Sequence, residues 1–187
     1  LQIIELIENF GPAKARNEGV MKSKGEFLCF LDNDTQVEKN WAEQAKKLFK
    51  KDLKIGIIQC KLLLADKKKI DYIGEYMSSN GFLVQKVRGG TVDDGSYDVQ
   101  EPILAAKSAG MFIRKVAFEK AGGFDEDYFI YVEETDLGWR SWLMGYKNIF
   151  LQGHSLGCSK IAFYQKIKNN RSIRGLIFIS PADMNGL

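Results

Sequence analysis

The sequence predicts an α/β fold in which helices cover both faces of a largely parallel sheet. Strand-like and helix-like segments alternate through the first two-thirds of the 187 residues, a pattern typical of such sandwiches. Residues 26–31 form a short and almost entirely apolar run, as expected of a strand that is covered on both faces. In residues 38–51, Trp41, Ala45 and Leu48 recur at the spacing of one helical stripe.

The individual elements follow from the same patterns. Helices are predicted at residues 13–21, where Pro12 marks the start and Gly25 the stop, and at 38–51, 115–121 and 133–144. Strands are predicted at residues 1–8, 26–31, 55–64, 108–114 and 147–152. Residues 66–101 have a looser pattern and predict a hairpin or long loop insertion outside the core, of the kind that often covers a binding site.

Composition limits the classes of partner and compartment. A net charge of +3 gives no reason to expect a nucleic-acid partner. Three widely separated cysteines without metal-ligand spacing favour a reducing, cytoplasmic compartment. No apolar run approaches the roughly 20 residues of a membrane span. The lysine pairs at 46–47 and 50–51 and the triplet at 67–69 favour a solvated helix face and a charged turn. Peripheral association with the inner face of a membrane is the alternative.

Two acids follow the buried strand at 26–31. In open α/β sheets, ligands bind beyond the carboxyl ends of the strands, and Asp32-Asn33-Asp34 stands at that position. Two carboxylates one residue apart can share a hard cation that also takes phosphate oxygens. Such a triplet is also common in ordinary turns, where Asp and Asn cap backbone groups, so the acids alone do not decide between the two alternatives.

The surrounding residues resemble the family 2 glycosyltransferases of the GT-A fold, a Rossmann-like α/β/α sandwich that binds nucleotide sugars. Residues 13–19 (AKARNEG) are similar to the family's AxxNxG helix, and residues 25–34 (GEFLCFLDND) to its GEYxxFLDxD strand. The resemblance implies that Asn17 and Asp32 bind the donor, with Asp32 near the ribose and phosphate. It also implies that Asp34, together with Asp32, ligates Mg²⁺ or Mn²⁺.

A second block carries the same resemblance, which spans residues 4–150. Residues 108–114 (SAGMFIR) are similar to the acceptor-side strand, and residues 131–140 (YVEETDLGWR) to the family's YxEDxDLxxR. The resemblance implies that Glu134 is the catalytic base, in place of the family's Asp. Substrate-binding roles follow for a further set of residues: Gly110, Glu133, Asp136 and Arg140.

The chemistry also favours a carboxylate at this position. An inverting transfer needs one general base to remove the proton of the acceptor hydroxyl. Glu133 and Glu134 begin a predicted helix, whose dipole favours the ionised form. Two structural alternatives stay open. The acidic cluster can cap the helix, and Asp136 with Arg140, spaced i,i+4, can form an ion pair that only stabilises the helix.

The last forty residues depart from this family. The resemblance implies a metal- or phosphate-binding His near Cys158, but the only His is His154. It lies in a G-x-S-x-G pattern at 153–157, between a strand at 147–152 and a predicted helix at 158–168, which a strand at 174–180 follows. Residues 145–187 therefore resemble the nucleophile-elbow β-α-β unit of the α/β-hydrolases, which implies Ser155 as an alternative esterase nucleophile. No His follows Ser155, so hydrolysis by this chain is not expected.

We therefore expect two units, a partial glycosyltransferase core at 1–150 and a hydrolase-like or divergent tail at 151–187. One hypothesis is a chimeric or misassembled reading frame joined at 145–150. Its rival is a diverged glycosyltransferase tail in which His154 is a shifted ligand. Because the sequence starts in mid-pattern, we expect a core truncated at its N-terminus.

The expected function is transfer of a sugar, with inversion, from a UDP-, GDP- or dTDP-sugar to a glycan or lipid-linked acceptor in cell-wall or polysaccharide biosynthesis. A non-catalytic fragment is the remaining alternative.

Overall fold

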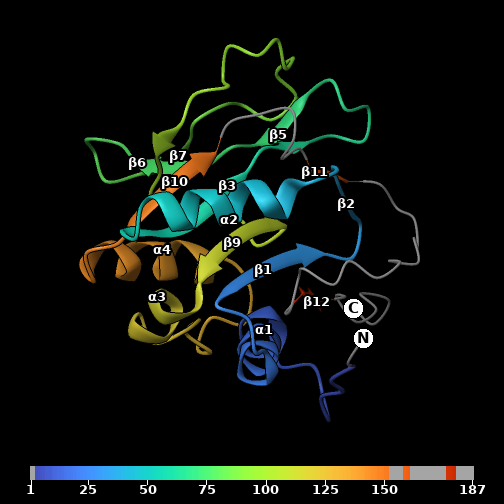
Figure 1. Cartoon of the computed structure of the whole chain (residues 1–187), viewed down its shortest axis with the longest axis vertical. Helices are drawn as coiled ribbons and strands as arrows, with labels where there is room; N and C mark the ends of the chain where they lie inside the picture. Colours follow the sequence, from blue (N-terminus) through green and yellow to red (C-terminus); the bar gives the residue numbers. More distant parts are fainter. Residues whose placement is uncertain (1–2, 152–157, 161–175, 180–187) are drawn as a thin grey trace.

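The structure is a computed structural model, which describes residues 3–151, 158–160 and 176–179. Within these residues, six strands form the main sheet in the order β12-β1-β9-β3-β10-β8 (Figure 1). Their bounds are Leu176–Ile179 for β12, Phe27–Asp32 for β1, Gly110–Arg114 for β9, Ile55–Cys60 for β3, Lys147–Leu151 for β10 and Glu101–Pro102 for β8.

The sheet is mixed, so the prediction of a largely parallel sheet is confirmed only in part. β12 pairs parallel with β1 and β10 pairs parallel with β3. β9 lies between β1 and β3 and runs antiparallel to both, and β8 runs antiparallel to β10. β9 follows the long insertion rather than a crossover helix, so the constraint that makes βαβ strands parallel does not apply to it.

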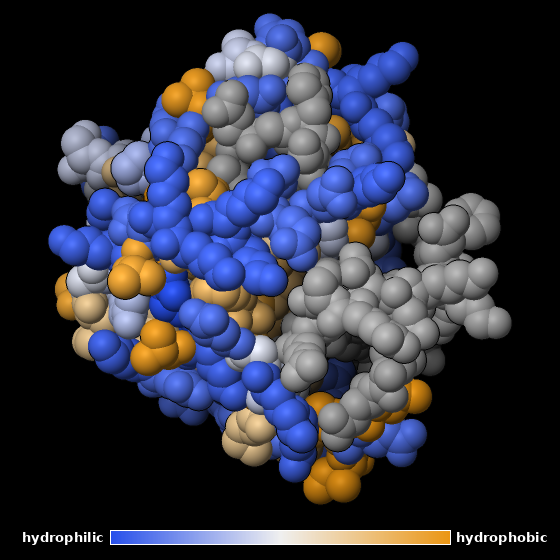
Figure 2. Space-filling model, in the orientation of Figure 1, coloured by the Kyte–Doolittle hydropathy of each residue, from blue (hydrophilic) through white to orange (hydrophobic). Residues whose placement is uncertain are grey.

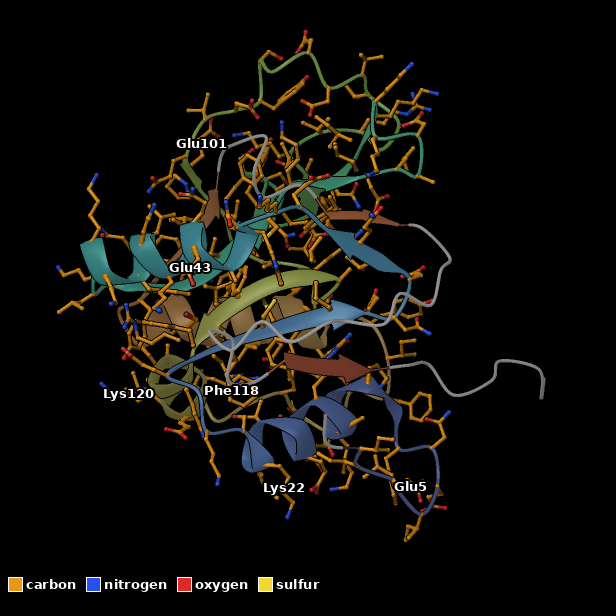
Figure 3. All side chains as sticks on the ribbon, turned by 45° about the vertical axis from the view of Figure 1, so that its right-hand side comes forward. Glu5, Lys22, Glu43, Glu101, Phe118 and Lys120 are labelled. Atoms are coloured by element: carbon orange, nitrogen blue, oxygen red, sulfur yellow. The ribbon has the colours of Figure 1, made fainter. Side chains whose placement is uncertain are left out.

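Helices cover both faces of the sheet, as predicted. Helix α2 (Trp41–Lys51) packs on one face, while α1 (Gly11–Lys22), α3 (Lys115–Lys120) and α4 (Glu133–Leu143) pack on the other (Figure 1). Side chains of each strand alternate between the two faces: Leu28 and Phe30 of β1 join the core beneath α1 and α3, and Cys29 joins the core beneath α2. Phe118 of α3, labelled in Figure 3, contacts the ring of Phe30.

The prediction of a strand at residues 1–8 is wrong for residues 3–8, which the structure describes as irregular. Ile3 and Ile7 are 78% and 96% exposed, so no apolar burial holds this segment. A strand also needs a neighbour to satisfy its backbone, and the edge of β1 is already paired with β12.

The predicted strand at 55–64 is interrupted at Lys61. β3 ends at Cys60 and the short β4 (Leu62–Leu63) belongs to a second sheet, in the order β2-β11-β4-β5. β2 spans Thr35–Val37 and β5 spans Ile70–Tyr72. Lys61, which stands at this break, is buried and pairs with Asp93 and Asp98 of the insertion.

The insertion at 66–101 is partly core, which corrects the prediction that it lies outside it. It does contain a hairpin, β6 (Glu75–Met77) with β7 (Leu83–Gln85), whose strands are mostly exposed. Ile70, Tyr72 and Ile73, however, are at most 1% exposed and pack in the cores. The apolar residues of the insertion are scattered among polar ones, so hydrophobic periodicity did not predict that some of them are buried.

The prediction of a helix that starts at Cys158 is wrong for residues 158–160. These form strand β11 (Cys158–Lys160), which pairs antiparallel with β2 and parallel with β4. Unpaired backbone groups beside β2 and β4 favour an added strand over a helix here. β12 lies within the predicted strand at 174–180. His154 and Ser155 lie outside the described residues.

The lysine-rich face of α2 is solvated. Lys47, Lys50 and Lys51 are exposed, while Trp41, Ala45 and Phe49 on the opposite stripe are buried. Figure 2 shows a hydrophilic band over this helix. Within the described residues, no helix is both long and apolar enough to cross a membrane.

Candidate active site

The Asp32-Asn33-Asp34 triplet forms the turn after β1. Asp32 is the last residue of the strand, and Asn33 and Asp34 connect it to β2. Asp32 and Asp34 are half-buried and Asn33 is exposed. The two carboxylates therefore lie at the carboxyl end of a buried strand, where open α/β sheets bind ligands.

Glu134, in the first turn of α4, has one oxygen held by the segment before β9. Its Oε1 accepts a hydrogen bond from the Ser108 backbone N–H at 2.6 Å and another from the Ser108 hydroxyl. Nη2 of Arg16 lies 3.6 Å from the same oxygen. In the part of the chain that the structure describes, no hydrogen bond reaches Oε2, and the side chain is 23% exposed. Oε1 is thus anchored, while Oε2 remains able to accept a proton from a ligand.

The carboxylate turn and Glu134 meet at one edge of the sheet. Leu31 of β1 pairs with Gly110 of β9, and the Thr35 hydroxyl donates to the carbonyl oxygen of Ala109 at 3.3 Å. Ala109 in turn follows Ser108, the residue that holds Glu134. Two hydrogen bonds and one peptide link therefore connect the residue after Asp34 to the predicted base. The predicted site residue Gly110 is buried at this junction.

Gln59 orders the same junction, and sequence reasoning missed it. Its Oε1 accepts from the Lys107 backbone N–H at 2.6 Å, and its Nε2 lies 3.3 Å from the carbonyl oxygen of Gly110. The side chain is fully buried. A polar residue in the apolar run at 55–60 was the available signal, because a buried amide requires specific partners.

Arg16 is the second residue that sequence reasoning missed. Its Nη1 donates to Oε1 of Glu133 at 2.7 Å, and both side chains are under 10% exposed. The other carboxylate oxygen of Glu133, Oε2, is buried without a partner. Glu133 therefore contacts α1 through Arg16, and its predicted role in substrate binding stays a prediction. Arg16 precedes Asn17 inside the AxxNxG block, but nothing in the local sequence indicates a partner 117 residues away.

The electrostatics of Glu134 favour a strong base. Burial raises the pKa of its carboxyl, whereas Arg16 and the hydrogen bonds from Ser108 lower it and the charge of Glu133 raises it further. The expected preference for the ionised form at a helix N-terminus is thus outweighed by lost hydration. Burial also raises the pKa of Glu75 and of the Tyr72 phenol, to which the charges of Glu75 and Glu134 add.

Asn17 joins α1 to the loop before α4. Its Nδ2 donates to the Phe124 carbonyl at 2.8 Å and to Oε1 of Glu126 at 3.0 Å, and its Oδ1 accepts from the Phe124 N–H at 3.0 Å. The amide is therefore occupied by the protein itself. Its predicted role in substrate binding stays a prediction.

Asp136 and Arg140 form the ion pair that was one of the two open alternatives. Nε of Arg140 donates to Oδ2 of Asp136 at 2.9 Å, and Nη1 donates to the Ala121 carbonyl at the end of α3. Positions two apart on a helix differ by about 200°, so Asp136 points away from Glu134. A hollow of about 460 Å³ lies on this side, lined by Asn17, Gly122, Phe124, Asp125, Glu126 and Arg140.

The donor set suits a cation that keeps other ligands. Among the described residues no group of three His, Cys, Asp or Glu side chains could hold a metal ion. Asp32 and Asp34 supply only carboxylate oxygens, the ligands that Mg²⁺ and Mn²⁺ accept alongside water and phosphate. The residues present therefore fit such a cation if a ligand completes its coordination.

The first part of the chain is similar to a known protein family. Residues 1–74 match the family model Glycosyl transferase family 2. The matched segment includes the Asp32-Asn33-Asp34 turn and ends before Glu134.

Two curated relatives share part of the chain. This chain is 26% identical over 130 residues to the O-antigen biosynthesis protein RfbC of Myxococcus xanthus. The alignment covers 66% of this chain and 10% of RfbC. The chain is 35% identical over 52 residues to an N-acetylglucosaminyl-diphospho-decaprenol L-rhamnosyltransferase of Mycobacterium tuberculosis, covering 28% of this chain and 17% of that protein. The chain thus spans a small part of the curated relatives that it matches.

Two solved structures share the fold beyond residues 1–74. One is GalNAc-T7, crystallised with UDP, GalNAc and Mn²⁺, with a TM-score of 0.64 at 16% identity. The superposition covers 84% of this chain and 32% of the GalNAc-T7 chain. TarS of S. aureus has a TM-score of 0.54 at 15% identity and covers 82% of this chain and 25% of that chain. The GT-A-like α/β/α fold predicted for residues 1–150 is thereby supported.

Proposed function

We propose that this chain is the catalytic part of a family 2 glycosyltransferase. It transfers a sugar from a nucleotide sugar to a glycan or lipid-linked acceptor, with inversion and with a divalent cation. One observation carries the proposal: Glu134 has one oxygen held by Ser108 and the other available, and it lies at the same sheet edge as the Asp32-Asn33-Asp34 turn. A base beside a cation-binding turn is the pair of groups that such a transfer requires.

The donor lies against the turn after β1. Asp34, with Asp32, would hold Mg²⁺ or Mn²⁺, and the cation would neutralise charge on the departing diphosphate. Asp32 lies at the ribose and phosphate end of the donor. UDP is one candidate nucleotide because GalNAc-T7 was crystallised with UDP and Mn²⁺; GDP and dTDP are the others.

Glu134 removes the acceptor proton. The acceptor oxygen forms a bond to the anomeric carbon from the face opposite the phosphate, the carbon–oxygen bond to the nucleoside diphosphate breaks, and the acceptor proton moves to Oε2. Because Ser108 holds Oε1, the carboxylate cannot rotate freely away from this position. The burial-raised pKa makes Glu134 a stronger acceptor for the proton.

The relatives indicate the acceptor class. One is named for O-antigen biosynthesis, and the other for transfer of L-rhamnose to N-acetylglucosaminyl-diphospho-decaprenol. We assign the chain to cell-wall or polysaccharide biosynthesis, with action in the cytoplasm at the inner face of the membrane when the acceptor is lipid-linked.

Donor binding tests the proposal directly. Calorimetric titration with UDP-, GDP- and dTDP-sugars, with and without Mn²⁺, is expected to show binding to one donor class that depends on Mn²⁺. Asp34→Asn is expected to weaken that binding at least about tenfold, because a neutral amide oxygen replaces a charged carboxylate oxygen as cation ligand. Asp127→Asn is the matched control, since Asp127 is exposed and outside the site.

Two results would count against the proposal. No binding to any nucleotide sugar would favour a non-catalytic fragment, and binding that survives Asp34→Asn unchanged would contradict the cation ligands. For a donor that is transferred, the anomeric configuration of the product, read by NMR, separates inversion from retention.

A further inference from the structure

Arg16 occupies a buried position between α1 and the two glutamates that begin α4. It is 7% exposed. Its guanidinium donates to Glu133 at 2.7 Å, lies 3.6 Å from Oε1 of Glu134 and stands 5.4 Å from the centroid of the Phe124 ring. One cation therefore faces two carboxylates and one aromatic ring, away from bulk water.

The position of this guanidinium is fixed by the elements around it. Asn17, the next residue of α1, exchanges two hydrogen bonds with the backbone of Phe124. At the start of α1, the backbone of Phe129 lies so close to Gly11 that a side chain there would collide with it. Both contacts join α1 to the loop before α4, so the backbone of Arg16 is held beside the two glutamates, and the hydrogen bond to Glu133 and the Phe124 ring hold its guanidinium.

We propose that Arg16 is a positioning residue for Glu134: its guanidinium, held by Glu133 and Phe124, stabilises the ionised Glu134 carboxylate against burial and steadies Oε1, so that Oε2 is presented to the acceptor hydroxyl. This inference rests on the proposed function. It adds a residue from the first helix of the fold to a base that lies 118 residues further along the chain.

Several charged or titratable groups face Glu134. Arg16 comes from α1 and Glu133 is its neighbour on α4. On the insertion side, burial and the charges of Glu75 and Glu134 raise the pKa of the Tyr72 phenol. The Lys107 ammonium lies 4.3 Å from the centroid of the Tyr72 ring. Of these, Arg16 is the main group that lowers the pKa of Glu134, and Glu133 is a group that raises it.

Opposite signs follow for two substitutions. Removing the positive charge in Arg16→Gln takes away a lowering effect, so Glu134 should hold its proton to higher pH. Removing the negative charge in Glu133→Gln takes away a raising effect, so Glu134 should lose its proton at lower pH. If the two substitutions only loosened the fold, Glu134 would gain hydration in both variants and its titration would move to lower pH in both.

The experiment is a titration of the Glu134 carboxyl by NMR, with ¹³C in glutamate side-chain carboxyls and assignment by the signal lost in Glu134→Gln. Relative to the native chain, the midpoint is expected to rise in Arg16→Gln, to fall in Glu133→Gln and to recover in part in Arg16→Lys. Arg88→Gln, which alters an exposed arginine, should leave it unchanged. In sugar-transfer assays, the acid limb of kcat/KM should move with the midpoint, with roughly a tenfold loss in Arg16→Gln below the midpoint.

The double variant Arg16→Gln/Glu133→Gln removes the buried ion pair as a whole, so Glu133 is not left as a charge without its cation, and this variant should fold even if Arg16→Gln does not. Its midpoint should still lie above the native one, because Arg16 is the larger of the two influences. A folded double variant with the native midpoint would overturn the inference. If the NMR midpoints move as expected while the acid limb of transfer does not, Arg16 does set the ionisation of Glu134, but the base assignment fails and the positioning role in transfer is overturned with it.

Discussion

Two buried clusters in this molecule each place one cationic side chain between two carboxylates. They differ in how many of the carboxylate oxygens the cation contacts. Lys61, 3% exposed at its side chain, donates to both oxygens of Asp93, at 2.8 and 3.0 Å, and to Asp98. Arg16 donates to one oxygen of Glu133 and faces one oxygen of Glu134.

The difference separates a cluster that holds the fold from one that can do chemistry. Burial lowers the pKa of Lys61, but the hydrogen bonds and charges of Asp93 and Asp98 outweigh it, and the pKa is raised. The charged form is thus the stable one. At Glu134 burial outweighs the partners, and the protonated form gains. When the partners of a buried carboxylate do not make up for its lost hydration, the carboxylate keeps a high affinity for a proton, as a general base must.

The largest expected effect is on transfer activity. Glu134→Gln should reduce kcat by about a thousandfold, since the general base is lost. Donor affinity should stay within about twofold of the native value, because the donor lies against the turn after β1. Radiolabelled sugar transfer and calorimetric titration measure the two quantities. Glu119→Gln, an exposed position on α3, is the control, and native activity in Glu134→Gln would exclude Glu134 as the base.

Lys61→Met should have the largest effect on stability. It leaves Asp93 and Asp98 partly buried without their cation, which costs about 3–5 kcal/mol of unfolding free energy. Urea denaturation measures the loss, and Lys67→Met, at an exposed lysine nearby, should cost little. A loss below about 1 kcal/mol would show that the insertion does not depend on this cluster.

Glu134→Asp gives the residue that the resembling family carries at this position, and its effect should be smaller. The shorter side chain can no longer accept both hydrogen bonds from Ser108 and still present its other oxygen, so we expect roughly a tenfold loss of kcat. The same transfer assay measures it. An increase in kcat would mean that the Ser108 contacts hinder the base.

The smallest effect concerns the pH dependence of stability. Burial raises the folded-state pKa of Glu134 above the ordinary value of a glutamate, about 4.5, so the folded state binds the proton more tightly than the unfolded state does. Its stabilising contribution is therefore present at low pH and is lost as the pH rises through the folded-state pKa. Glu134→Gln should remove this loss, so its unfolding free energy should exceed that of the native chain increasingly as the pH rises above about 4.5. Thermal denaturation at several pH values tests the sign.

The sequence carried the local part of the site and missed the part that depends on long-range contacts. The strand at 26–31 and the acidic helix at 133–144 were predictable, because apolar runs and the acids that follow them are adjacent in the chain. The pairing of Arg16 with Glu133 and of Lys61 with Asp93 depends on how distant elements pack. A single charged residue in the apolar run at 55–64 was the only local signal for the second pair.

The wrong predictions have a related cause. Residues 3–8 have a strand-like pattern, but a strand forms only where a neighbouring edge is free, and β12 pairs with that edge of β1. Residues 158–160 looked helical within the G-x-S-x-G context, yet they pair with β2 and β4. In both segments the available edges of the sheets decided the structure, and those edges are not visible in the sequence of the segment itself.

The hydrogen bond from Thr35 to Ala109 couples donor binding to acceptor binding. It links the turn that takes the donor to the backbone that holds Glu134, so a shift of either segment reaches the other. Under the proposed function, loading the donor and setting the base are one coupled equilibrium. By thermodynamic reciprocity, an acceptor that engages Glu134 must then tighten donor binding by the same factor by which the donor tightens acceptor binding.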